Sequence, residues 1–303
     1  MKALLKSIAK RVLFGNRVAK SFPAVRIPIG KVEEKVFLSW PDGRLDISER
    51  HCIVCHAPFC LSVWLTPEEW RRVETNVPTI SVTTGEKIHA ELITAVVKKI
   101  DVANGFLVVV KAEKAFCHQK SAWFQYFIRR YFKNKNSAEE DKFYAAAYSY
   151  PRRVIAVSFR DESYYNIFPM DFQCHIPQSG LYVLGLRTTN ITLQKIIQSE
   201  KIVIGDTDGA ELSVIYALGN NHSSQPPSIE QLPFTVSASE AFHFPVPDFS
   251  ASYKEIRLIG HYNLGTHTML VGEIVNAREV REKQSYLYHI SFLQSLGMHY
   301  TSA

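Results

Sequence analysis

The chain has 303 residues, of which 46% are hydrophobic and 21% are charged, a composition typical of a globular protein with ample material for a core. The formal net charge of +6 is modest for this length, so it permits anionic ligands and does not indicate nucleic-acid binding. No run approaches about 18 uninterrupted apolar residues, so we expect no transmembrane helix.

The first twenty residues, MKALLKSIAKRVLFGNRVAK, carry six cations and no acid. Lys6, Lys10 and Arg11 interrupt any signal-peptide core, so we expect no export signal and a cytoplasmic protein. Apolar residues near one helical face predict a terminal helix docked on the protein, with a membrane-surface helix as the alternative.

The first half of the chain is predicted to contain several short strands. They are expected at Lys35–Trp40, His51–Leu65 (one strand or a pair), Thr79–Thr83, His89–Ile100 and Gly105–Ala112. A helix is expected to begin after Thr66, which is the N-cap, with Pro67 at its first position.

Residues 121–133 are aromatic and basic, and their spacing predicts a helix with a broad apolar face. Packing of the aromatic rings is the favoured interpretation, and clamping of single-stranded nucleic acid is the alternative. Residues 133–141 form a polar break. We therefore predict a domain boundary near residue 145, with an N-terminal accessory region (1–145) followed by a second domain (146–303).

The second half continues the pattern of strands with few helices. Strands are expected at Arg153–Phe159, Leu181–Leu186, Lys201–Gly205, Glu255–Ile259 and Met269–Asn276, a helix at Asn190–Lys201 with Asn190 as N-cap, and a long polar loop at Gly219–Pro233. The chain is thus predicted to be mainly β with a few helices (α+β), built as a closed or split barrel. A comparison of SERHCIVCH with PRRVIAVSF gives too little likeness to support an internal duplication.

Two polar segments interrupt the strands of the second half. In NIFPMDF (Asn166–Phe172), Pro169 marks an edge or a bend, where backbone groups are free to face a flat polar ligand. In RTTNIT (Arg187–Thr192), a guanidinium and several hydroxyls precede a predicted helix. A charged fork beside a helix N-terminus suits a phosphate, although simple capping would explain the same residues.

These motifs, with GTHTMLVGEIVNARE (Gly265–Glu279) and the closing YLYHISFLQSLGMHY (Tyr286–Tyr300), resemble the flavin reductase-like family over roughly the second half of the chain. The resemblance implies an FMN-binding split β-barrel, with the flavin where two barrels meet in a homodimer. It implies that the cofactor-binding residues are Asn166, Phe168, Pro169, Met170, Asp171 and Phe172 around the ring, Arg187, Thr188, Thr189, Asn190 and Thr192 around the phosphate, and His267 near the flavin.

The activity implied by the resemblance is flavin-dependent oxidoreduction with NADH or NADPH as donor. The cofactors carry the reactivity, so no further acid–base group is required. The alternatives are a non-catalytic flavin-binding electron carrier or a degenerate member with an empty pocket. The apolar side chains of residues 168–170 are expected to be exposed in a monomer and covered by a second subunit, which also predicts a homodimer.

Cys52, Cys55 and His56 have the Cys-x-x-Cys-His spacing of c-type haem attachment, which makes a haem electron-transfer protein a remote alternative. A zinc site that adds His51 is equally remote. The favoured interpretation is that the cysteines are buried small hydrophobic residues, with no metal bound. The odd total of five cysteines also argues against a disulfide framework.

Overall fold

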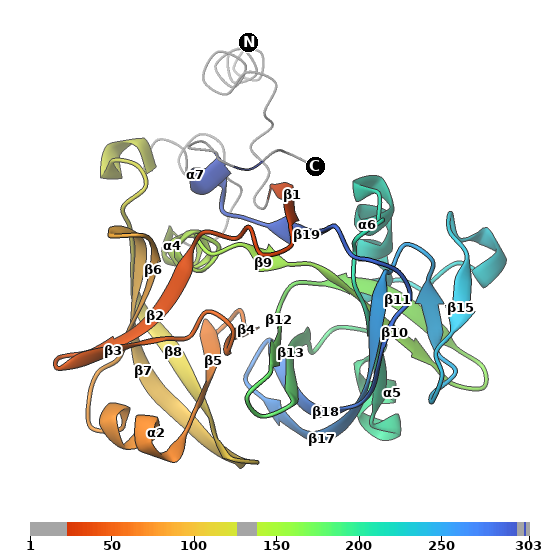
Figure 1. Ribbon diagram of the computed structural model, residues 1–303, viewed down its shortest axis with the longest axis horizontal. Helices are drawn as coiled ribbons and strands as arrows, with labels where there is room; N and C mark the ends of the chain where they lie inside the picture. The colour runs from red at the N-terminus through yellow and green to blue at the C-terminus, as the bar shows by residue number, and fades with distance from the viewer. Residues whose placement is uncertain (1–22, 126–137, 296–299, 301–303) are drawn as a thin grey trace, which may run out of the picture.

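The computed structural model describes residues 23–125, 138–295 and 300. Two seven-stranded antiparallel sheets dominate it, one from each half of the sequence, and they lie side by side in Figure 1. The first sheet has the order β3 (Gly43–Asp46), β2 (Lys35–Trp40), β6 (Thr79–Thr84), β7 (Lys87–Val102), β8 (Gly105–Cys117), β5 (Cys60–Leu65) and β4 (His51–Cys55). The second has the order β11 (Tyr165–Met170), β10 (Ile155–Arg160), β14 (Lys201–Gly205), β17 (Ser252–Asn263), β18 (His267–Glu279), β13 (Leu181–Arg187) and β12 (Gln173–Ile176).

Smaller elements join and cover the two sheets. A three-stranded sheet is formed by β1 (Ala24–Pro28), β19 (Ser285–His289) and β9 (Arg152–Arg153), and a two-stranded one by β15 (Val236–Ala238) and β16 (Pro245–Pro247). The described helices are α2 (Pro67–Val73), α4 (Ala138–Ala147), α5 (Leu193–Ser199), α6 (Leu212–Leu218) and α7 (Phe292–Ser295), with 3-10 turns η1 (Gly219–His222) and η2 (Ile229–Gln231). Helix α4 packs against β7 and β8.

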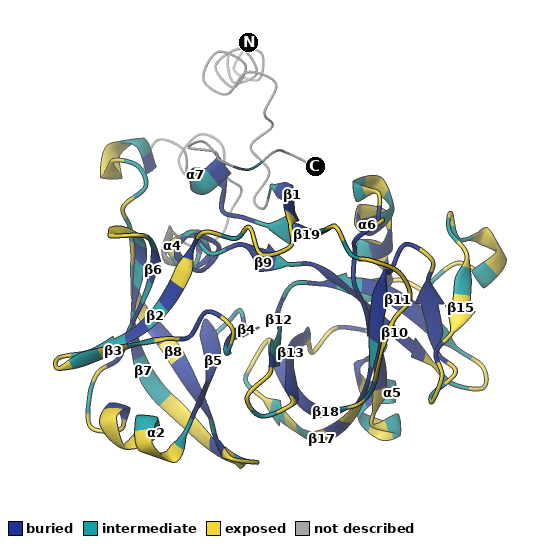
Figure 2. Ribbon diagram, in the orientation of Figure 1, coloured by how far each residue is buried: buried dark blue, intermediate teal, exposed yellow. Residues whose placement is uncertain are grey.

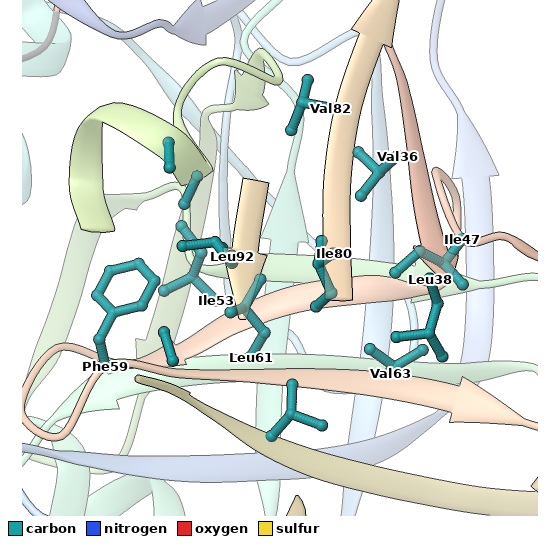
Figure 3. Packing of buried hydrophobic residues seen from close by; sticks show 14 of the residues in the cluster. Val36, Leu38, Ile47, Ile53, Phe59, Leu61, Val63, Ile80, Val82 and Leu92 are labelled. Carbon is teal, nitrogen blue, oxygen red and sulfur yellow. The ribbon is translucent and has the colours of Figure 1, made fainter. Parts of the chain in front are cut away.

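Each sheet encloses a core of its own, and a third apolar cluster joins them. Alternation along β5 turns Leu61 and Val63 into the first core, part of which Figure 3 shows, while Trp64 points the other way. Alternation along β13 likewise separates Leu184, in the second core, from Val183. The opposite-facing residues form the cluster between the sheets, and the inner strands are accordingly buried in Figure 2.

The two sheets approach each other closely at Gly185. A Cβ atom at this position would lie 2.7 Å from Cα and 2.8 Å from the carbonyl oxygen of Val54 in β4. Only glycine therefore allows β4 to pack against β13 at this distance, and the contact fixes how the two halves meet.

Most of the expected elements are confirmed, including the Thr66 cap of α2, where Thr66 and Glu69 form a capping box. Two boundaries were wrong. Helix α5 starts at Leu193 after the N-cap Thr192, because the Asn190 side chain accepts a hydrogen bond from the Thr192 N–H (2.8 Å) in a turn before the helix. The expected polar break at 133–141 gives way to α4 from Ala138 onward.

Other expectations fall partly or wholly outside the described residues. The N-terminal helix lies outside them, and of the aromatic segment 121–133 only residues 122–125 are described as helical, with Trp123 77% exposed. The proposed boundary near residue 145 falls inside α4. No helix within the described part of the chain is long and apolar enough to cross a membrane.

The apolar surface expected at residues 168–170 is largely absent. Phe168 is 0% and Met170 is 7% exposed, because both side chains point into the second core. Pro169 is half-buried on β11, an edge strand, as its missing N–H requires. The patch that was expected to need a second subunit is therefore covered within one chain.

We predict that Gly185→Ala lowers the free energy of unfolding by about 1–3 kcal/mol, the usual cost of overpacking, because the added methyl meets β4 backbone. The control is Gly219→Ala, where nothing lies within 4 Å of the new atom and φ is −58°. It should be neutral or stabilising by up to about 1 kcal/mol. Urea unfolding measures both, and equal effects would contradict the close contact.

Candidate functional site

A cavity of about 410 Å³ lies where the second sheet meets α4. Its wall combines the end of β11, the end of β13 and the turn after it, the start of β18, and η1. It is lined by Tyr144, Tyr148, Val154, Pro169, Met170, Asp171, Phe172, Gly185, Leu186, Arg187, Thr189, Asn190, Ile215, Tyr216, Gly219, His222, Ser223, His267 and His289.

Eight of the twelve residues implied by the family resemblance line this cavity. They are Pro169, Met170, Asp171, Phe172, Arg187, Thr189, Asn190 and His267. The segment that follows β11 and the end of β13 are held together, because the Gly185 N–H donates to the Phe172 carbonyl (2.9 Å). The two sequence motifs are thereby brought to one wall.

The other four residues lie outside the lining and have structural partners. The fully buried Asn166 amide donates to Thr192 Oγ1 (2.7 Å) and to the Asn221 carbonyl (2.9 Å). Thr188 Oγ1 donates to the Thr266 carbonyl (3.2 Å), and Phe168 packs on the ring of His222 at 4.9 Å.

Arg187 is the cation of the site. It is exposed at the end of β13, opposite His267 in the strand register. Among the described residues, no carboxylate forms an ion pair with its guanidinium. Its charge contributes, after burial, to lowering the pKa of both His267 and His222. The cavity thus has a positive corner suited to an anion.

His267 is held as a neutral ring. The backbone N–H of His56 donates to its Nδ1 (3.3 Å), so Nδ1 is the acceptor and the ring proton is on Nε2. Burial, then the nearby Arg187 charge, lowers its pKa to about 4. The ring stacks on Phe172 with centroids 5.3 Å apart and an interplanar angle of 29°. These two rings form a flat, uncharged part of the wall.

Asp171 carries the negative charge of the site. Its Oδ2 accepts from Tyr148 Oη (2.7 Å) and pairs with His289 Nδ1 (2.7 Å). Burial alone would raise the pKa of this carboxyl, but the His289 and Tyr148 hydrogen bonds outweigh burial and lower the pKa. Burial raises the pKa of Tyr148 well above its usual value. Asp171 is therefore a carboxylate that fixes a tyrosine and a histidine at the cavity.

His222 connects the two motifs from the long polar loop. Its Nδ1 accepts from the Asn190 amide (2.9 Å), so Nε2 carries the proton and donates to the Pro169 carbonyl (2.8 Å). The first turn of the long polar loop expected at Gly219–Pro233 thus lines the cavity.

Sequence analysis missed several lining residues, chiefly Tyr144, Tyr148, His222 and His289. A signal existed for the tyrosines, since positions four apart in a helix share one face. His289 lies in the closing segment that carries the family resemblance, but no role was assigned to it. His222 carried no signal, because only the folded loop places it beside Pro169.

The cysteine motif is separate from the cavity lining. Cys52 and Cys55 are 1% and 0% exposed in the cluster between the sheets, and burial raises the pKa of the Cys52 thiol well above its usual value. Thiols enclosed in this way oppose haem attachment, which needs both sulfur atoms at an open face. Within the described ranges, no three His, Cys, Asp or Glu side chains are grouped to hold a metal ion.

Neither a family model nor a curated protein matches the chain. Among solved structures, it is similar to NADH:FAD oxidoreductase SgcE6 of Streptomyces globisporus C-1027 (13% identity, 54% of this chain and 95% of that one, TM-score 0.43). It is also similar to flavin reductase HpaC complexed with NADP+ (15%, 50% and 90%, TM-score 0.40) and to an FMN-binding protein of Thermus thermophilus (18%, 43% and 72%, TM-score 0.38). The expected flavin reductase-like fold is thus matched over about half the chain, alongside an additional sheet.

We predict that His267 contributes a pH-dependent stability. With its pKa at about 4 against an ordinary 6.5, the unfolded chain takes up a proton between these pH values and the folded chain does not. The free energy of unfolding then falls as pH drops from 6.5 to 4, by up to about 3 kcal/mol from this residue.

The contribution is isolated by comparing the wild type with His267→Gln in urea at neutral and acidic pH. The variant should lose less stability on acidification than the wild type does. A stability difference between the two proteins that stays constant with pH would contradict a neutral, buried His267.

Proposed function

We propose that the cavity binds FMN and that the protein is an NAD(P)H-dependent flavin oxidoreductase. The observation that carries this proposal is the Arg187 guanidinium, which has no carboxylate partner among the described residues and stands at one end of a cavity with aromatic and apolar walls. A single cation beside Thr189 and Asn190 suits one phosphate group.

The other lining residues fit a flat heteroaromatic ring. The volume of about 410 Å³ falls in the range of small-molecule sites, roughly 300–1,000 Å³. Pro169 and Ile215 supply apolar surface, while the Nε2–H of neutral His267 offers a donor for a polar ring edge. Gly185 also lines the cavity, and the space its side chain would take is filled by the Val54 backbone of β4. The donor set and the apolar wall thus match a flavin mononucleotide.

The chain's own residues would position the reactants and shield them from water. A bound flavin supplies the hydride-accepting chemistry, and the protein contributes binding and orientation. Asp171 holds the His289 ring at the cavity through Nδ1, so a group able to pass a proton faces the bound molecules. A nicotinamide donor of either kind would bind against the remaining aromatic surface of Tyr144 and Tyr216.

We predict that Arg187→Ala weakens FMN binding by about 1.5–3 kcal/mol, or roughly 10- to 100-fold in Kd, the range for a hydrogen bond to a charged group. Riboflavin, which lacks the phosphate, should lose much less affinity. The control is Arg257→Ala, which removes an exposed charge of the same kind from β17 outside the cavity. Equal weakening of FMN and riboflavin would show that Arg187 does not contact the phosphate.

The activity is tested with the purified protein titrated with FMN and then given NADH or NADPH. We expect oxidised flavin absorption bands and oxidation of the nicotinamide. Flavin bands without oxidation would identify an electron carrier, and no uptake of FMN would identify a degenerate pocket. A haem Soret band would overturn the flavin proposal altogether.

A further inference from the structure

The two large sheets have the same topology. Numbered by chain order within its own half, each has the strand order 2-1-5-6-7-4-3. In each half a seven-residue helix, α2 or α5, follows the fourth strand. Strands β15 and β16 of the second half belong to a separate sheet and leave this order unchanged. Seven strands can be arranged in a sheet in many different orders. The occurrence of the same order in both halves therefore points to a repeated unit.

The β-bulges repeat as well. The long hairpin of each half, β7–β8 and β17–β18, contains two register shifts. They fall at Ile93/Thr94 and Val96/Lys98 in the first hairpin and at Glu255/Ile256 and Leu258/Gly260 in the second. Each of the four residues in the first hairpin lies 162 residues before its counterpart in the second. A bulge is a local irregularity that a strand order does not require, so this agreement is independent support for a repeat.

The halves meet through corresponding strands. The cluster between the sheets takes its residues chiefly from β4, β5 and β8 on one side and from β12, β13 and β18 on the other. Leu107 and Val109 of the first half have Met269 and Val271, again 162 residues later, as their counterparts. A contact made by the same patch on both sides is the signature of a twofold dimer, here within one chain.

The cavity depends on this internal contact. Tyr144 reaches it from α4 and Tyr148 from the turn directly after α4, a helix that follows the last strand of the first sheet and packs on that sheet. The turn before His267 is fixed to the first half by a reciprocal pair, in which the Thr266 N–H donates to the Ala57 carbonyl (3.0 Å) and the Ala57 N–H donates to Thr266 Oγ1 (2.9 Å). The first half therefore supplies one wall of the site.

In the first half, a large side chain stands at the position that corresponds to Gly185. The Trp64 N–H donates to the Arg50 carbonyl (2.9 Å) just as the Gly185 N–H donates to that of Phe172, so Trp64 is the counterpart of Gly185. The strand registers likewise make Gly105 the counterpart of His267. A Cβ on Gly105 would lie 3.1 Å from the Trp64 indole, which occupies the space.

The charged residues around Trp64 also differ from those around Gly185. Arg50 lies over Trp64 at 5.9 Å and is bound by Glu69 of α2 at 3.1 Å, so its guanidinium is neutralised. The residue after β5 is Thr66, whereas Arg187 ends β13. A separate cavity of about 340 Å³ touches the turn between β3 and β4, but none of residues 64–69 lines it.

We propose that the chain is a tandem duplication of one split barrel, whose first repeat takes the place of a second subunit at the cavity, and that only the second repeat keeps an open site. The first repeat then extends through α4 to Tyr148, close to the boundary predicted near residue 145. One chain forms one complete site, and no partner chain is needed to close it. The duplication itself is independent of the proposed flavin function. The number of FMN molecules bound per chain rests on that proposed function.

Light scattering on the ligand-free protein over a wide range of concentrations tests the replacement of the partner without any flavin. We expect the monomer mass of 34.5 kDa throughout. A stable dimer that also restores FMN binding in the complementation test below would overturn the proposal, because a second chain would then supply the wall. Failure of the flavin function would leave this measurement unaffected.

Complementation between chains tests where the site is closed. One variant carries Arg187→Ala in the second repeat, and the other carries Tyr144→Ala with Tyr148→Ala in the first. If each chain closes its own site, mixing the two variants restores no FMN binding beyond their sum. Restoration would show that the wall comes from another chain, and titration of the wild type to two FMN per chain would show that the first repeat's site is open.

Discussion

The close approach of β4 to β13 at Gly185 is the contact on which the site depends. The absence of a side chain there lets Val54 backbone come within 3 Å of where a Cβ would stand. The apolar cluster between the sheets builds on the same contact. As a result, Tyr144 and Tyr148 reach the cavity, and the Ala57–Thr266 pair fixes the turn before His267 to the first half.

The electrostatics of the cavity depend on which ionisable side chains of its lining have hydrogen-bond or ion-pair partners. Asp171 Oδ2 accepts hydrogen bonds from Tyr148 and His289, and these bonds outweigh burial and hold the pKa of the carboxyl low. His267 and His222 are kept neutral by burial and by the neighbouring guanidinium. Arg187 is the only arginine or lysine among the described residues of the lining, an arrangement that suits an anionic ligand.

The two halves show how one fold can support or fill a site through a few side chains. In the second half, Gly185 and His267 line the cavity. Tryptophan and glycine at the corresponding positions 64 and 105 exchange the bulk, so the indole takes the space. Strand order and bulges are the same in both, which illustrates that function belongs to the site and not to the fold.

The sequence by itself determined the local structure and the motifs of the second half. Alternation and turn residues located most strands, and Thr66 with Pro67 located α2, because these signals act over a few residues. The motifs at 166–172 and 187–192 predicted a flavin-binding wall through their resemblance to the flavin reductase-like family, since helix capping and a bent strand would explain the same residues. Of these residues, Asn166 and Thr192 do not line the cavity and are hydrogen-bonded to each other outside its lining.

Only the tertiary structure decided what closes the cavity and how the halves are related. The comparison of residues 48–56 with 151–159 could not detect a repeat, since β4 corresponds to β12 and β10 to β2. Counterpart positions such as Trp64 and Gly185 share backbone geometry and not side-chain chemistry. Strand pairing and bulge position are properties of hydrogen bonds between distant segments, so they persist in the fold when the sequence no longer shows them.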